Sequence, residues 1–512
     1  MNLVEEVRKQ CLQHPEKYAF IYENQQTTYG EFEKHVSRFA FSLKEIGVQR
    51  GEHVALILNN SPYFLIAYYA SMRIGATLIP INPIYTMEEM SYIVDHGDVT
   101  WVIAGEESFE RVTQLRQAFK QIKGIIVCDE NEIEADNRGG SGEMLYLFSD
   151  LMKGTSGMDP VSLEEDDVAM ILYTSGTTGY PKGAMLTHGN LYANAKDVGE
   201  FFLFTKEDRV IATLPFYHVF GLTVVLNVPL SKGACVLIAP RFSPKGIFEL
   251  ALNYNATVFA GVPTMYSFLY QYTEGDPNSF SHLRLAISGG AALPIKVLEN
   301  FEERFKIPIF EGYGLSEASP VTCFNPPTRV RRPGSIGTSI PNVENKIVDD
   351  EGKEAEIGEV GELVCRGPNV MKGYYKSPEA TRNAIRDGWL YTGDLAKQDE
   401  EGYFYIVDRK KDLIIVGGLN VYPREVEEVL YKHLKVLEAA VIGVPNDDYG
   451  EEVHAFISLK SSDCSVEELE DFCEKYLAKY KIPKVFHFID ALPKNSTGKI
   501  LKRTLKVSFS NQ

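Results

Sequence analysis

The chain has 512 residues, which is too long for one ordinary domain and indicates two to four structural units. Hydrophobic residues make up 44% of it and charged residues 24%, as is usual for globular proteins. The formal net charge of -18 argues against an electrostatic nucleic-acid binder, which needs a basic face, although local lysines and helix ends can still hold a phosphate.

The cysteines and the two ends of the chain carry little signal. The seven cysteines lie far apart, with no CxxC and no His/Cys cluster at zinc spacing, which is typical of thiols in a reducing cytosol. The opening MNLVEEVRKQ contains acidic residues and no apolar core, so we expect no signal peptide. Because no run of about 18 apolar residues occurs, we expect no membrane span and a cytoplasmic protein. Its oligomeric state and any transient membrane contact stay open.

The first half of the chain alternates short apolar runs with amphipathic stretches. This alternation predicts parallel sheets covered by helices. The predicted strands are 53–59, 76–81, 101–105, 124–129 and 234–240, and the predicted helices between them include 61–75 and 87–97. A segment rich in Gly, Ser, Asp and Glu, 130–167, predicts a surface excursion.

The second half of the chain has a different pattern of predicted elements, with more short strands and turns. From about residue 335, short strands and turns predict a β-rich subdomain. After the charged DRKKD at 408–412, a helix and a strand are expected, followed by a helix over 466–480. The last hundred residues or so therefore predict a small α+β domain.

One small-residue loop, YTSGTTGYPKG at 173–183, raises a functional question. It lies between a buried-strand pattern at 169–176 and a helical pattern at 188–201, the general arrangement in which backbone N–H groups hold phosphate. It is not a P-loop, since Pro181 stands where the second Gly belongs and Gly183 where the Ser or Thr belongs. The dinucleotide pattern GxGxxG fails as well, because Glu317 replaces its third Gly.

The loop resembles the phosphate loop of the adenylate-forming, AMP-dependent synthetase superfamily, whose pattern is [ST]SGTTGxPKG. Five further stretches resemble that family's motifs in the same order, and the resemblance covers essentially the whole chain. They are EGYGLSEASP (311–320), YTGDLA (391–396), VDRKKDLI (407–414), GGLNVYPREVE (417–427) and LPKNSTGKI (492–500). Within the superfamily the resemblance is greatest to bacterial long-chain fatty-acid–CoA ligases.

The resemblance implies a fold and a two-step reaction. The fold is a large N-terminal domain of helix-covered mixed and parallel sheets with a β-rich subdomain, and a small mobile α+β C-terminal domain. Its implied limits are 1–407 for the ATP and acyl domain, 408–412 for a hinge at Lys411, and 413–512 for the C-terminal domain. ATP, Mg²⁺ and coenzyme A are the implied cofactors and substrates, and small molecules are the only implied partners, with no nucleic acid. A carboxylate attacks the α-phosphate of ATP, and a thiol then displaces AMP.

The resemblance also implies which residues bind the nucleotide and the metal. Asp394 would accept hydrogen bonds from both ribose hydroxyls, because the two oxygens of a carboxylate match the two hydroxyls of a vicinal diol. Glu317, with Thr174, would hold Mg²⁺, a hard cation suited to oxygen ligands. The implied nucleotide-binding residues are Thr174, Ser175, Gly176, Thr177, Thr178, Gly179, Lys182, Gly289, Gly290, Glu311, Gly312, Tyr313, Ser316, Asp394 and Arg409.

The remaining implied roles concern the acyl group and the thiol. Lys499 would bridge the substrate carboxylate and the α-phosphate, and His218 would lie beside that carboxylate. Gly418, Leu419 and Asn420 would form the face that meets CoA, where a glycine lets pantetheine pass close to the backbone. The implied walls of the acyl pocket are Val219, Val262 and Thr264.

Three alternatives are weighed against a fatty-acid–CoA ligase. Amino-acid adenylation enzymes use an Asp near PFYHVFG, and 214–223 contains no Asp or Glu. An aryl–CoA ligase shares the chemistry, and the motifs do not separate it. Intact Lys499, Glu317 and Asp394 argue against a catalytically dead binding protein.

Overall fold

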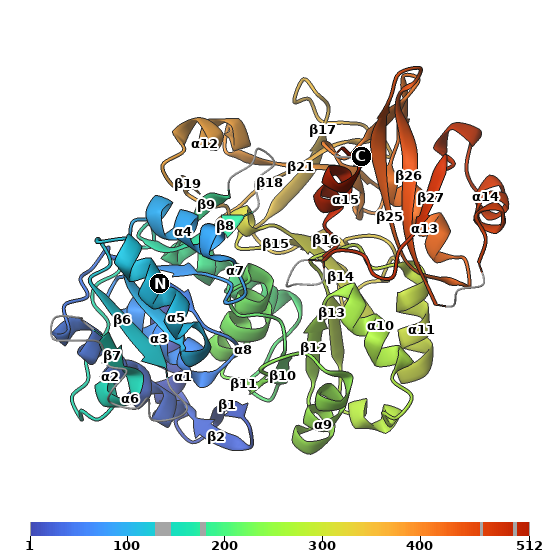
Figure 1. Ribbon diagram of the computed structural model, residues 1–512. Coiled ribbons are helices and arrows are strands. Elements are labelled where there is room, and N and C mark those ends of the chain that lie inside the picture. The colour runs from blue at the N-terminus through green and yellow to red at the C-terminus, as the bar shows by residue number, and fades with distance from the viewer. Residues whose placement is uncertain (1, 129–144, 175–180, 461–463, 495–498, 511–512) are drawn as a thin grey trace.

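The computed structural model describes residues 2–128, 145–174, 181–460, 464–494 and 499–510, and within them the strands form four sheets. Figure 1 shows two large sheets with their helices in the N-terminal four fifths of the chain and a separate group of elements, orange to red, at the C-terminal end. The arrangement is the mixed α/β fold that the sequence predicts.

The nine-stranded sheet is parallel at its centre and antiparallel at both edges. Hydrogen-bonded neighbours follow in the order β16, β15, β14, β13, β12, β10, β11, β1, β2. Its strands are β16 (Thr338–Ser339), β15 (Val321–Phe324), β14 (Ile309–Gly314), β13 (Leu285–Ser288), β12 (Val258–Gly261), β10 (Arg209–Ala212), β11 (Cys235–Ile238), β1 (Tyr18–Tyr22) and β2 (Gln25–Thr28).

The eight-stranded sheet is also mostly parallel, with an antiparallel edge at β9 and β19. Hydrogen-bonded neighbours follow in the order β19, β9, β8, β4, β3, β5, β6, β7. Its strands are β19 (Gly373–Tyr374), β9 (Lys182–Thr187), β8 (Val168–Thr174), β4 (Thr77–Pro80), β3 (His53–Ile57), β5 (Val99–Gly105), β6 (Gly124–Cys128) and β7 (Leu145–Leu147).

Two smaller sheets complete the described chain. An antiparallel sheet, the predicted β-rich subdomain, contains β17 (Glu344–Val348), β18 (Gly361–Arg366), β20 (Ile385–Arg386), β21 (Trp389–Gln398) and β22 (Phe404–Arg409). The C-terminal sheet contains β23 (Ile414–Val416), β24 (Leu419–Val421), β25 (Val436–Asn446), β26 (Gly450–Leu459) and β27 (Val485–Phe488).

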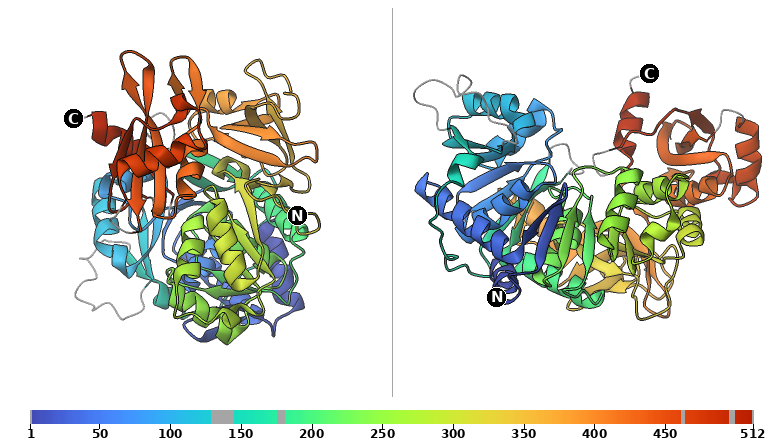
Figure 2. Two further views of the ribbon diagram at one scale, coloured as in Figure 1. Left: turned by 90° about the vertical axis from the view of Figure 1, so that its right-hand side faces the viewer. Right: turned by 90° about the horizontal axis from the view of Figure 1, so that it is seen from below.

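Helices connect and cover these sheets, as Figure 2 shows from two further directions. The α-helices are α1 (Leu3–Gln13), α2 (Tyr29–Glu45), α3 (Pro62–Arg73), α4 (Met87–His96), α5 (Phe109–Ala118), α6 (Phe148–Leu151), α7 (His188–Phe201), α8 (Val228–Ser231), α9 (Pro244–Tyr254), α10 (Pro263–Gln271), α11 (Ile295–Phe305), α12 (Pro378–Ala384), α13 (Pro423–Tyr431), α14 (Val466–Glu474) and α15 (Lys502–Ser510). A π-helix (Gly221–Asn227) and short 3₁₀ turns, among them η5 (Ser316–Ala318), lie between them. None of the described helices has both the length and the apolar character that crossing a bilayer requires.

Local sequence signals set several helix starts. Thr28, Thr86 and Thr187 each accept a hydrogen bond from the backbone N–H three residues later. In return, the side chains of Glu31, Glu89 and Asn190 accept the backbone N–H of the cap residue. These reciprocal capping boxes satisfy N–H groups that the first turn of a helix leaves unpaired.

Two sequence expectations need correction. The predicted surface excursion 130–167 contains β7, which extends the eight-stranded sheet, and α6, whose Phe148 packs against Phe39 with ring centroids 4.6 Å apart. The helix expected over 466–480 ends at Glu474, and a short 3₁₀ turn (Lys479–Lys481) follows it. Both errors come from judging a segment by its polar composition and length without its packing partner.

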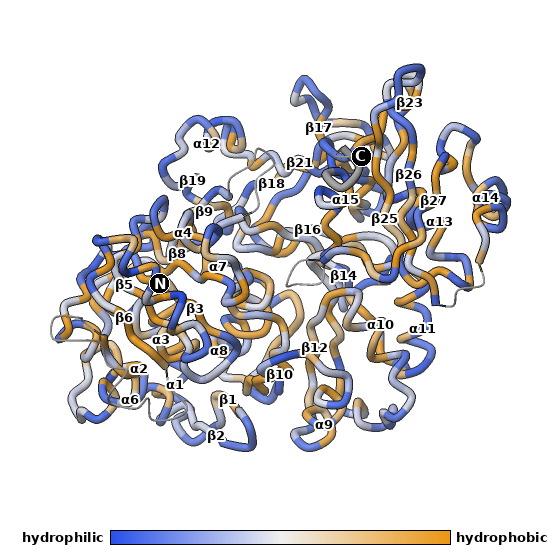
Figure 3. Tube along the Cα trace, in the orientation of Figure 1, coloured by the Kyte–Doolittle hydropathy of each residue, from blue (hydrophilic) through white to orange (hydrophobic). Residues whose placement is uncertain are grey.

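The apolar core is divided between the two ends of the chain. Hydrophobic residues concentrate in the strands and on the inner helix faces (Figure 3). The large clusters of the N-terminal part contain no residue beyond 390, while the C-terminal sheet and its helices have clusters of their own drawn from residues 414–505. The C-terminal segment is therefore packed as a unit with its own core.

A buried asparagine joins the two large sheets. Asn60 follows β3 of the eight-stranded sheet and is 4% exposed. Its Nδ2 donates to the Leu214 carbonyl at 2.9 Å, and its Oδ1 accepts from the Phe216 N–H at 2.8 Å. Leu214 and Phe216 belong to the turn after β10 of the nine-stranded sheet. One side chain thus fixes the turn that leads to His218.

We expect Asn60→Ala to lower the free energy of unfolding by about 2–4 kcal/mol, because two backbone groups lose their buried partners. Thermal unfolding of the variant checks this, with Asn59→Ala as the control because Asn59 is exposed. Equal melting temperatures for the wild type and Asn60→Ala would contradict this role.

Candidate active site

The predicted site residues gather at the carboxyl ends of the parallel strands. Strands β10, β12, β13 and β14 of the nine-stranded sheet end at one edge, where open α/β sheets bind ligands. The segments that follow carry His218, Val262, Gly289 and Gly290, and the last residues of β14, which ends at Gly314, include the predicted Gly312 and Tyr313. Sequence segments up to a hundred residues apart are therefore brought to the same edge.

Glycines at this edge are required by close packing. A Cβ at Gly312 would lie 1.9 Å from the Phe324 ring, and a Cβ at Gly289 would lie 3.1 Å from the Phe220 ring. Gly290 has φ +80°, which few other residues adopt, and its Cβ position lies 3.5 Å from Val262. The predicted adenine segment therefore packs directly against the predicted acyl segment.

Asp394 lies between an aromatic and a cationic partner. It sits on β21, paired in register with Arg409 of β22, and the Arg409 Nε is 3.5 Å from its Oδ1. The Tyr313 hydroxyl donates to the other oxygen, Oδ2. Burial, followed by the Asp394 charge, raises the pKa of Tyr313 well above its ordinary value, so the phenol stays a donor. The structure brings these three predicted nucleotide-binding residues together.

Glu317 is held by a tyrosine that the sequence did not single out. The Tyr374 hydroxyl donates to the Glu317 Oε1 at 2.8 Å, and the Lys182 Nζ lies 5.3 Å from the centroid of the Tyr374 ring. Tyr374 reaches this position because β19 pairs with β9, placing it opposite Ala184. Thr174, the last residue of β8, is the register partner of Lys182. This pairing of distant strands leaves no local signal, which explains why Tyr374 was missed.

Lys499 comes from the C-terminal segment and lies near His218. Burial, and then the Lys499 charge, lower the pKa of His218 to about 4. Burial, the Arg409 charge and other nearby groups lower the pKa of Lys499 itself to about 8, while Asp394 opposes them. The His218 ring accepts the Phe220 N–H at its Nδ1 at 3.3 Å. The two predicted catalytic residues are therefore close, although one follows β10 and the other lies near the end of the chain.

Other predicted residues lie at the edge of this site or outside it. Lys411 is exposed in the turn that joins β22 to β23, and Gly418, Leu419 and Asn420 are exposed at the β23–β24 hairpin. Val219 and Val262 are buried, Thr264 is half-buried on α10, and Ser316 opens η5. Predicted residues Ser175, Gly176, Thr177, Thr178 and Gly179 lie outside the described residues.

The buried Glu311 side chain binds the loop that follows β13. It is 2% exposed, its Oε1 accepts the Leu293 N–H at 2.9 Å, and among the described residues its Oε2 has no hydrogen-bond partner. Burial raises its pKa to about 7, against the lowering effect of the Arg424 charge. The carboxyl therefore anchors the segment after Gly290 through the Leu293 N–H.

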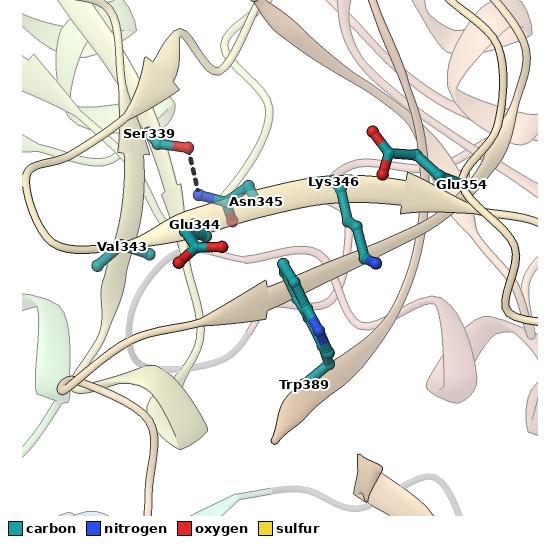
Figure 4. A pocket seen from close by; sticks show the side chains of 7 residues that line it. All are labelled: Ser339, Val343, Glu344, Asn345, Lys346, Glu354 and Trp389. Carbon is teal, nitrogen blue, oxygen red and sulfur yellow. Dashed lines mark hydrogen bonds between the residues drawn. The ribbon is translucent and has the colours of Figure 1, made fainter. Parts of the chain in front are cut away.

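A separate hollow of about 400 Å³ lies on the β-rich subdomain (Figure 4). The Lys346 Nζ lies 4.3 Å from the Trp389 ring centroid there, and the Asn345 Nδ2 donates to the Ser339 Oγ at 2.9 Å. The hollow is wide open, and none of the predicted site residues lines it.

Comparison with known proteins decides the family. A family model described as AMP-binding enzyme matches residues 7–375, and one described as AMP-binding enzyme C-terminal domain matches residues 425–499. The chain belongs to the AMP-binding enzyme family. This confirms the predicted superfamily.

Relatives and solved structures of this family align over nearly the full chain. A long-chain-fatty-acid–CoA ligase of Bacillus subtilis (strain 168) is 37% identical over 96% of this chain and 91% of its own length. The ATP-bound structure of MatB from Rhodopseudomonas palustris is 34% identical, with a TM-score of 0.91 over 100% of this chain and 99% of that one. An anthranilate CoA ligase in complex with anthranoyl-AMP is 28% identical, with a TM-score of 0.92 over 100% and 98%.

The described side chains fit a nucleotide and a divalent cation. Asp394 offers a carboxylate for a sugar diol, and the Glu317 carboxylate keeps a second oxygen beyond the one that accepts from Tyr374. Lys182, Arg409 and Lys499 supply positive charge from three different elements. Together, these carboxylates and cations suit the binding of a nucleoside triphosphate with its divalent metal ion.

The lowered pKa of Lys499 predicts an alkaline limit to the first reaction step. The protonated cation is present below about pH 8 and is lost as the pH rises through that value, well below the pKa of an ordinary lysine. We expect kcat/KM for pyrophosphate release, which reports the free enzyme, to fall tenfold per pH unit above about pH 8. A profile that stays flat to pH 10 would contradict this assignment.

The matched control for this profile is Lys499→Arg, whose cation persists across the measurable range. Any residual activity of that variant should show no fall in kcat/KM above about pH 8.

Proposed function

We propose that this chain joins a fatty acid of medium or long chain to coenzyme A, using ATP and Mg²⁺ and releasing AMP and pyrophosphate. The carboxylate attacks the α-phosphate of ATP, pyrophosphate leaves, and the acyl-adenylate stays bound until the CoA thiol displaces AMP. The observation that carries this proposal is the placement of Lys499 beside His218 and within the field of Asp394 and Arg409.

The reaction needs cations where two anions meet. Lys499, Arg409 and Lys411 act on one another electrostatically, so three positive charges converge on one region. A unit-charge pair at ~4 Å is worth ~1 kcal/mol in water and ~4 kcal/mol at an effective dielectric of ~20. Lys499 therefore bridges carboxylate and α-phosphate best where protein replaces water.

The remaining roles follow the chemistry of each side chain. Asp394 would accept the ribose hydroxyls, with Arg409 beside it, and Tyr313 would stack on the adenine. Glu317, steadied by Tyr374, would hold the Mg²⁺, which would neutralise phosphate charge. Lys182 would add charge at the phosphate loop.

We further propose that 413–512 moves as a unit about 408–412, with Lys411 in the turn. The separate apolar core of the C-terminal segment supports this division. The exposed Gly418, Leu419 and Asn420 lie outside the Lys499 site, so a rotation of the segment would be needed to bring them to the acyl-adenylate. One domain would thus serve both half-reactions in turn.

The location proposed for this enzyme is the cytoplasm. Its seven cysteines are buried and none of them forms a disulfide, as is usual in a reducing compartment.

The acyl substrate is tested by measuring pyrophosphate release with ATP, Mg²⁺ and a panel of acids. We expect fatty acids to be preferred over aromatic acids, and the names of the sequence relatives favour long chains such as palmitate. A preference for benzoate or anthranilate would replace the fatty-acid assignment by an aryl–CoA ligase. No release with any acid would overturn the proposed reaction.

Lys499→Ala should separate the two half-reactions. Acyl-adenylate formation should fall by about 3 kcal/mol or more in transition-state stabilisation, over a hundredfold in rate, because the bridging cation is lost. Conversion of synthetic acyl-AMP and CoA to the thioester should stay near the wild-type rate. Equal damage to both steps would mean that Lys499 supports the fold or both domain arrangements.

A further inference from the structure

The segment 367–376, GPNVMKGYYK, is bonded to the short turn η5 that carries Glu317. The Met371 N–H donates to the Glu317 carbonyl at 2.8 Å, and the Asn369 Nδ2 donates to the Ala318 carbonyl at 2.9 Å. Asn369 is fully buried, and a hydrogen bond is stronger where water is excluded. The backbone of the proposed metal carboxylate is therefore held by this segment.

The same segment is bonded to β9, which leads out of the predicted phosphate loop. On either side of β19, the Lys372 N–H donates to the Met185 carbonyl at 2.9 Å and the Tyr375 N–H donates to the Gly183 carbonyl at 2.8 Å (Figure 1). Strand β9 belongs to the eight-stranded sheet, whereas Glu317 follows β14 of the nine-stranded sheet. The segment thus ties the two large sheets together beside the candidate site.

The Tyr374 side chain contacts a predicted ligand-binding group from each sheet. Its hydroxyl donates to the Glu317 Oε1 at 2.8 Å, and the Lys182 Nζ lies 5.3 Å from the centroid of its ring. Lys182 stands two residues before Ala184, the register partner of Tyr374, so both side chains leave the same face of the sheet. A cation at this distance is attracted by the face of an aromatic ring.

The position of the Tyr374 ring is fixed from its own backbone. The Tyr374 N–H donates to the Thr381 Oγ1 of α12 at 2.8 Å. A Cβ at Gly373 would lie 2.7 Å from the Thr381 Cγ2, so the close approach of α12 to β19 requires a glycine there. Burial, and then the Glu317 charge, raise the pKa of Tyr374, so its phenol stays protonated and remains a donor.

A carboxylate that accepts a hydrogen bond at one oxygen keeps its other oxygen for a cation. Metal-binding carboxylates are usually hydrogen-bonded in this way, and loss of the partner weakens metal binding by about 10- to 100-fold. We infer that Tyr374 is a positioning residue, which orients Glu317 for the Mg²⁺ of bound ATP and holds Lys182 beside it. This inference rests on the proposed function.

The test compares Tyr374→Phe with the wild type in the full-length enzyme. The variant keeps the ring beside Lys182 and loses the hydroxyl that donates to Glu317. Calorimetric titration without acid or CoA, and therefore without turnover, gives the Kd of ATP with Mg²⁺ and with EDTA. We expect the Kd of ATP with Mg²⁺ to rise about tenfold. The Kd of ATP with EDTA should change less than about twofold, because the ring beside Lys182 is kept.

A double variant separates positioning from a general structural effect. If Tyr374 acts through Glu317, adding Tyr374→Phe to Glu317→Gln weakens the binding of ATP with Mg²⁺ no further than Glu317→Gln alone. Loosening of the fold would instead add its full effect in both backgrounds. Additive effects would therefore overturn the inference.

Tyr375→Phe is the matched control, because it removes a hydroxyl from the next residue of the chain. The Tyr375 hydroxyl donates to the Asp98 Oδ2 at 2.7 Å, and its ring packs against a different core cluster from that of Tyr374. This variant should bind ATP with Mg²⁺ as the wild type does. Tyr374→Leu, which also removes the ring beside Lys182, should in addition weaken the binding of ATP with EDTA.

An unchanged Kd of ATP with Mg²⁺ in Tyr374→Phe would overturn the inference. An equal rise in Tyr375→Phe would do the same, and unchanged binding of ATP with EDTA in Tyr374→Leu would contradict the role toward Lys182. Failure of the proposed function is a separate result: the wild type would then release no pyrophosphate with any acid, whereas the binding measurements need no acid.

Discussion

Repulsion between a carboxylate and a triphosphate is the constraint around which this molecule is built. Positive charge has to stand between the two anions in a site with little water, and an isolated buried lysine is unstable as a cation. Burial therefore lowers the pKa of Lys499, and the negative charge of Asp394 partly offsets this lowering by stabilising the protonated lysine. The lysine comes from a segment with its own core, so a part of the chain that packs separately from the two large sheets supplies this cation.

The nine-stranded sheet provides the edge at which this lysine lies. Parallel strands of the nine-stranded sheet end together, and their following segments carry the groups predicted to meet adenine, ribose and the acyl carboxylate. Tight packing at Gly289 and Gly312 leaves these segments little freedom. Asn60 adds a tie between the two sheets, which fixes the turn before His218.

The sequence by itself determined the family, the chemistry and the alternation of strands and helices, because these depend on contiguous motifs and on local periodicity. EGYGLSEASP and LPKNSTGKI carry residue types at fixed spacing, and the capping threonines act over three residues. Only the tertiary structure decided that Tyr374 holds Glu317, that β7 extends a sheet, and that Asn60 joins the two large sheets. Each of these depends on two segments far apart in the chain meeting in space, which no local pattern of residues records.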